Sequence, residues 1–214
     1  MFLSLLASVA AVHSSAGATA LELKTVAILP WIYRGGTNTA MKTANDALDA
    51  FFDKAKCDRQ SKVKVVSAWE EAMGKSNIKE VGEENDPMPD LPNAKDLLAL
   101  GKKMGVDYVC AGRAKWHTKS VWISLGPKTK ADCTVDVELV DVHKEELALN
   151  QTGIKADDTR RESGLETAAA ILVSMGFTAF SGGPKTPHQQ KAVVNALGLA
   201  FEPWLKTMVD NKIK

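Results

Sequence analysis

The sequence has little cysteine, no excess of charge of either sign and no long apolar run beyond its first twenty residues. Its three cysteines are too few for a disulfide scaffold and too scattered for a zinc site. The 27 Lys and Arg residues against 26 Asp and Glu residues argue against a dedicated nucleic-acid-binding protein. No stretch reaches the roughly 18 apolar residues of a membrane span, which excludes a polytopic membrane protein. The composition is typical of a soluble globular chain.

Charged residues are also missing from residues 1–20, MFLSLLASVAAVHSSAGATA. The apolar run 2–12 has the length of a signal-peptide core and is too short to span a bilayer. Two triplets, AGA at 16–18 and ATA at 18–20, fit the A-x-A rule for signal peptidase, although no positive charge precedes the run. We therefore expect cleavage near residue 18 or 20, and a periplasmic or secreted protein with one domain over 21–214. A buried amino-terminal helix is the alternative.

The rest of the chain alternates between strand and helix patterns. The apolar run 26–29 is typical of a strand buried on both faces, and Pro30 is expected to end its pairing. We expect strands over 23–32, 62–68, 106–118, 131–142 and 147–154, and helices over 41–55, 94–104, 163–180 and 187–208. These patterns predict an α/β fold: a single three-layer-like domain with a mixed sheet of about five strands flanked by helices, an exposed β-hairpin and two carboxyl-terminal helices.

Three segments resemble a known group of envelope proteins. They are the strand 26–30, which ends in proline, the helix-glycine-strand run LLALGKKMGVDYVCAG at 97–112, and VDVELVDVHKEEL at 135–147. Their order is similar to the TolB amino-terminal domain, the periplasmic curli-secretion lipoproteins and the outer-membrane lipoproteins that activate penicillin-binding proteins. The resemblance covers about residues 22–156. The chain departs from the group where His143-Lys144 replaces a Thr-Gly turn, and it has no lipidated cysteine after its apolar run. The resemblance implies an envelope-associated assembly or regulatory role without catalysis.

Signals for catalysis or for a bound cofactor are weak. The sequence has no G-x-S-x-G, no H-E-x-x-H and no Gly-Lys-Ser/Thr phosphate loop, and we expect no cofactor. The loop Arg34-Gly35-Gly36 precedes a helix, where main-chain N–H groups can bind an anion, but a plain tight turn explains it as well. Four residues suggest metal ligands that solvated strand alternation also explains, so we expect no metal: Asp132, Asp136, Asp141 and His143.

The cysteines are expected to be free thiols at two of their three positions. Cys110 and Cys133 lie on neighbouring strands, and pairing about the turn at Gly126-Pro127 places them far beyond disulfide reach. We therefore expect both to be buried thiols. Cys57 follows a helix and is expected to be partly exposed, and a bridge from it to either of the others stays open.

Charge is unevenly distributed along the chain. Residues 109–131 contain five cationic residues and no acid, whereas 80–96 contain six acids and one lysine. A basic hairpin with two tryptophans is expected to contact a protein or an envelope component. The alternative is a solvated edge hairpin on which lysines block aggregation and one tryptophan covers the sheet. The expected contact residues are Arg113, Lys115, Trp116, His117, Lys119 and Trp122.

Three functions remain open. The first is a non-catalytic periplasmic protein that binds a protein or envelope partner through this hairpin, in assembly or regulation. The second is a small periplasmic hydrolase or transferase, with a site at the carboxyl ends of the strands near Tyr33, Arg34 and Gly35. The third, allowed by the resemblance, is a subunit of a secretion-type oligomeric assembly. We expect neither nucleic acid as a partner nor a stable transmembrane segment after cleavage, and the sequence leaves the oligomeric state open.

Overall fold

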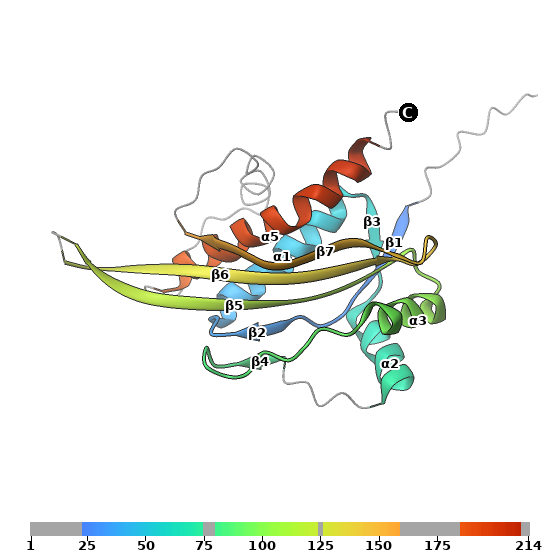
Figure 1. Ribbon diagram of the computed structural model, residues 1–214, viewed down its shortest axis with the longest axis horizontal. Coiled ribbons are helices and arrows are strands. Elements are labelled where there is room, and N and C mark those ends of the chain that lie inside the picture. Colours follow the sequence, from blue (N-terminus) through green and yellow to red (C-terminus); the bar gives the residue numbers. More distant parts are fainter. Residues whose placement is uncertain (1–22, 75–79, 124–125, 159–184, 211–214) are drawn as a thin grey trace, which may run out of the picture.

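The computed structural model describes residues 23–74, 80–123, 126–158 and 185–210, without the side chains of 121–123, 126, 127, 209 and 210. The expected signal peptide and the expected helix 163–180 lie outside the described residues. The described chain forms one seven-stranded mixed sheet with helices on both faces, which confirms the α/β class (Figure 1). Its strands are β1 (Lys24–Ile28), β2 (Ile32–Arg34), β3 (Cys57–Arg59), β4 (Val81–Gly82), β5 (Tyr108–Ile123), β6 (Gly126–Asp141) and β7 (Glu146–Asp157).

The strand expected over 23–32 is divided into two strands, β1 and β2, which pair in succession along the same side of β5. Both β1 and β2 pair in parallel with β5, with Val26 opposite Tyr108 and Ile32 opposite Arg113. Between them the chain leaves the sheet at Pro30, which has no N–H to donate. The expectation that Pro30 ends the pairing is confirmed. Short parallel strands, β3 beside β1 and β4 beside β2, complete this side of the sheet.

The expected strand 62–68 is wrong, because this segment is the helix α2 (Lys62–Met73). The side chain of Ser61 caps it by accepting the N–H of Lys64. The alternating valines do not share one buried face: Val65 is fully buried, whereas Val63 is 76% exposed. The strand that follows the first helix is instead the three-residue β3. Valine's preference for strands was overridden here by the cap and by packing of one helical face.

Two separate apolar cores lie on opposite faces of the sheet. Helices α1 (Asn38–Lys54) and α5 (Thr186–Asp210) cover one face, where Phe51 and Phe201 stack with ring centroids 5.4 Å apart. Of the described helices, α2 and α3 (Ala94–Met104) lie on the opposite face, at one end of the sheet. The α3 helix begins at the N-cap Asn93 and ends at Gly105 with φ +64°, as its sequence predicts.

The carboxyl-terminal helix packs as expected. Its apolar stripe, spaced at three and four residues, is Val193, Leu197, Phe201, Trp204 and Met208; the first four side chains are buried and Met208 is half-buried against the same core. Trp204 contacts Phe52 and Tyr108 edge-on, with centroids 5.5 and 5.7 Å away. The helix continues through Pro203 to Asp210.

A long antiparallel hairpin, β5–β6, dominates the sheet. Its two strands have 16 residues each, and its far end extends beyond β7 and α5 (Figure 1). The register places Trp116 opposite Cys133, and Cys110 opposite Leu139. All three cysteines are free and buried, which confirms the expectation for Cys110 and Cys133. The expected partial exposure of Cys57 is wrong, because β3 places its side chain in the core under α1.

Candidate contact surface on the β5–β6 hairpin

Trp116 is a core residue, and its expected place on an exposed contact surface is wrong. Its side chain is fully buried, and its indole Nε1 donates a 2.9 Å hydrogen bond to the main-chain oxygen of Gln189 on α5. The sequence already contained a pattern that indicates the burial of Trp116. Side chains alternate between the faces of a strand, so Trp116 shares a face with the apolar Cys110 and Ala114, whereas every cation of β5 has the opposite parity.

The loop Arg34-Gly35-Gly36 packs against this tryptophan. A Cβ on Gly36 would lie 2.7 Å from two ring carbons of Trp116, and Gly35 has φ +72°. The Arg34 side chain is buried, and its guanidinium donates to the main-chain oxygens of Tyr33 and Pro87. The loop is thus a tight turn held by packing.

Two main-chain amides that an anion at this helix start would need are already bonded to side chains. The N–H of Thr37 donates to Gln189 Oε1 at 2.9 Å, and the N–H of Ala40 donates to the Thr37 hydroxyl at 3.3 Å. These contacts favour the structural interpretation of the loop over an anion site.

The face of the hairpin opposite Trp116 is polar and points away from α1 and α5. Four lysines share it, and we call them the lysine face: Lys115 and Lys119 on β5, and Lys128 and Lys130 on β6. Lys130 is half-buried and the other three are exposed. None of the four makes an ion pair or a hydrogen bond through its side chain with any residue of the described chain.

Other cations on the same face are paired with carboxylates. Arg113 Nε donates to Asp136 Oδ2 at 2.6 Å across the β5–β6 ladder. His117 contacts Glu84, and Lys155 on β7 lies 3.2 Å from Asp132. The four lysines therefore differ from these neighbours in having no carboxylate partner in the described chain, and two of them, Lys119 and Lys130, are directly opposite each other. Like charges in this position repel.

The acidic and basic stretches of the sequence meet on this face. After β4, residues 83–92 cross the face of β5, where Glu84 contacts His117 and the oxygen of Pro89 accepts from Arg113 Nη1 at 2.5 Å. Asp90 lies 3.9 Å from the same guanidinium nitrogen. The sequence contains both charged stretches but does not show that they lie side by side. Of the six expected contact residues, Arg113 and His117 are thus largely engaged within the chain, Lys115 and Lys119 are exposed, and the Trp122 side chain lies outside the described part.

The residues that suggested a metal site are dispersed along β6 and engaged elsewhere. Asp132 pairs with Lys155 and Asp136 with Arg113, whereas Asp141 accepts the N–H groups of His143 and Lys144 in the β6–β7 turn. Within the described ranges, no group of three or more His, Cys, Asp or Glu side chains is arranged to hold a metal ion.

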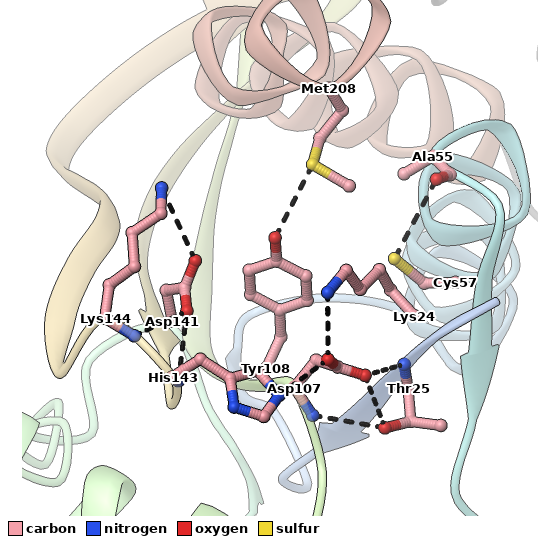
Figure 2. Close-up of polar contacts among 10 residues, drawn as sticks. All are labelled: Lys24, Thr25, Ala55, Cys57, Asp107, Tyr108, Asp141, His143, Lys144 and Met208. Carbon is pink, nitrogen blue, oxygen red and sulfur yellow. Dashed lines mark hydrogen bonds and ion pairs between the residues drawn. The ribbon is translucent and has the colours of Figure 1, made fainter. Parts of the chain in front are cut away.

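His143 instead joins a polar cluster at the other end of the sheet (Figure 2). Its Nε2 lies 2.8 Å from Asp107 Oδ1, and Asp107 also accepts from the amide and hydroxyl of Thr25 and from Lys24. Burial alone would raise the pKa of Asp107, but the Thr25 and Lys24 contacts outweigh it and lower the pKa to about 2. The cluster ties the start of β1 to the start of β5.

A cleft of about 830 Å³ opens where the sheet edge is interrupted, between the end of β3 and the start of β4. Its lining includes Tyr33, whose hydroxyl donates to Asn45 at 2.7 Å, and Arg59, which pairs with Asp49 and Asp53. Burial raises the pKa of Tyr33 well above its usual value, so its hydroxyl stays protonated.

A raised pKa is one mark of a carboxylate that can act as a general acid, and burial raises the pKa of Glu138. Glu138 lies on β6, outside the cleft lining. Arg34, expected near a catalytic site, is buried under residues 82–87 and is not among the lining residues.

Comparison with known proteins gives neighbours in structure only. No family model matches the sequence, and no curated protein matches it. Lipoprotein GNA1162 from Neisseria meningitidis aligns with a TM-score of 0.40 and 11% identity, over 72% of this chain and 99% of its own. The LpoB C-terminal domain from Escherichia coli aligns with a TM-score of 0.34 and 16% identity, over 61% and 81%. TolB from Acinetobacter baumannii aligns with a TM-score of 0.30 and 18% identity, over 72% and 29%.

The structural neighbours thus include a TolB and a lipoprotein, as the sequence resemblance does. With identities below 25% and TM-scores below 0.5, this likeness assigns neither an activity nor a partner to the chain. In the described part of the chain, no helix combines the length and the apolarity that crossing a membrane requires.

Proposed function

We propose that this chain is a non-catalytic protein of the bacterial envelope that binds a macromolecular partner through the lysine face. One observation carries the proposal: four lysines that have no carboxylate partner among the described residues share one face of a projecting hairpin, beside Arg113, His117 and Lys155, which contact carboxylates. Surface charge left unpaired in this way attracts an anionic partner and steers its approach. The uncharged apolar opening 2–12 and its two A-x-A triplets support export.

The geometry of the hairpin suits a docking surface. Among the described strands, β5 pairs only with β6 beyond Lys115, where β2 ends, and β6 loses its pairing with β7 beyond Asp132. The far end is therefore a two-stranded ribbon. The face opposite the lysines is anchored to α5 through Thr118, since the Thr118 hydroxyl accepts a 3.0 Å hydrogen bond from Gln189 Nε2. A partner can approach the lysines without displacing a helix.

A comparative pull-down from an envelope extract tests this function. The test variant carries Lys119→Gln, Lys128→Gln and Lys130→Gln, which remove charge and keep similar side-chain length. The matched control carries Lys54→Gln, Lys64→Gln and Lys95→Gln, three exposed lysines on α1, α2 and α3. We expect the test variant to lose a partner that the control and the original protein retain, with unchanged thermal stability. Equal retention by both variants would rule out the lysine face as the contact.

A further inference from the structure

The chain already shows how this face accommodates an acidic segment. Residues 83–92 form no helix or strand, and residues 83–86 make a turn in which the N–H of Asp86 donates to the main-chain oxygen of Glu83 at 3.1 Å. Pro87, Pro89 and Pro92 keep residues 87–92 out of a helix where they cross β5. Two kinds of contact hold the segment. The carboxylate of Glu84 contacts the His117 ring, and the main-chain oxygen of Pro89 accepts a hydrogen bond from Arg113. The two together recognise an acidic polypeptide rather than an isolated negative charge.

The lysine face continues this surface outward. Lys115 lies between Arg113 and His117 on the same face of β5, and Lys119 lies two residues beyond His117. Residues two apart on one strand are about 6.6 Å apart, and so are alternate residues of an extended peptide. Lys128 and Lys130 have this spacing on β6. Carboxylates on every second residue of an extended segment can therefore meet successive cations.

Resting on the function proposed above, we infer that the partner presents an extended, acidic polypeptide segment to the lysine face. A flat anionic membrane fits less well. Asp90 is fully exposed beside Arg113, and Glu84 lies beside His117, so a charged plane laid on this face would approach both carboxylates. A narrow peptide lying along the outer part of the hairpin avoids them.

The test uses the full chain and a fluorescein-labelled octaglutamate peptide, followed by fluorescence anisotropy at about 50 mM salt, where screening is weak. We expect saturable binding that the Lys119→Gln, Lys128→Gln, Lys130→Gln variant weakens at least about tenfold, and that the helix-lysine control weakens no more than about twofold. Binding should also fall steeply as salt rises to about 300 mM. An equal loss in both variants, or no binding to the original protein, would overturn the inference.

A second arm replaces the peptide with vesicles of phosphatidylglycerol. We expect weaker dependence on the three lysines than the peptide shows, and the reverse order would overturn the polypeptide assignment. Failure of this inference is distinguishable from failure of the proposed function. If the envelope partner is lost from the test variant while octaglutamate does not bind, the contact surface stands and only its acidic-segment partner is wrong.

Discussion

The indole of Trp116 on β5 donates its hydrogen bond to the main-chain oxygen of Gln189, in the first turn of α5. The Gln189 side chain completes the junction: its Nε2 donates to Gly35 O at 2.9 Å, and its Oε1 accepts the N–H of Thr37 at 2.9 Å. One residue pair thus connects the hairpin, the last helix and the start of α1. The tryptophan packs in the core of the domain, whereas the lysines on the other face of its strand form the proposed contact surface.

Replacing Trp116 by alanine should therefore destabilise the fold rather than impair binding selectively. Truncation of a fully buried tryptophan costs about 3–5 kcal/mol, which lowers the melting temperature by roughly 10 °C in a domain of this size. Thermal and urea unfolding of Trp116→Ala measure this loss. Lys119→Ala, three residues along β5, is the control and should change the melting temperature little. A Trp116→Ala protein with an unchanged melting curve would contradict the core position.

Asp107 should make stability depend on acid pH. Its pKa is about 2 in the folded chain and about 3.9 in an unfolded one. Because the folded pKa is the lower one, the stabilisation is fully present above about pH 4 and is lost as the pH falls towards about 2.

The matched variant is Asp107→Asn, compared with Asp58→Asn on the exposed side of β3. Urea unfolding should show Asp107→Asn less stable than the original protein near neutral pH, with a difference that shrinks below about pH 4. Asp58→Asn should show no such convergence. A difference that is constant across this pH range would mean that the carboxylate contacts of Thr25 and Lys24 are not stabilising.

The three cysteines should resist alkylation in the native state. All are buried, and burial raises the pKa values of the Cys110 and Cys133 thiols, which disfavours the reactive thiolate. Iodoacetamide should modify all three only after denaturation, as counted by intact mass. Rapid native modification of Cys57 would show that β3 opens readily, and a mass two units low in untreated protein would reveal a disulfide.

Export should remove the amino-terminal segment. The A-x-A triplets predict that the native protein begins at Thr19 or Leu21, which its intact mass would show. Replacing Ala16, Ala18 and Ala20 by bulky residues should block processing and leave the longer form. A processed chain is not expected in the cytosol, and a soluble cytosolic form that retains Met1 would contradict export.

Local patterns were sufficient for much of the fold. In 131–142 the apolar residues Cys133, Val135, Val137 and Leu139 alternate with polar ones and form the buried side of β6. The capping residues Asn93 and Gly105 bound α3, and the apolar stripe of α5 is its packed face. These features depend on side-chain spacing within one element, so the sequence contains them. The same parity rule, applied to β5, would also have placed Trp116 inside.

Other features depend on which distant segments meet, and only the tertiary structure decided them. Residues 62–68 have a strand composition, yet a cap and one buried valine make them helical. The acids of 83–92 contact Arg113 and His117 but not the lysines, because the chain crosses β5 before the sheet narrows to two strands. Charge counts along the sequence cannot show this, since pairing at 3–4 Å depends on the path of the chain through space. The sequence determined that the hairpin is basic; the fold determined which of its charged side chains have partners within the described chain.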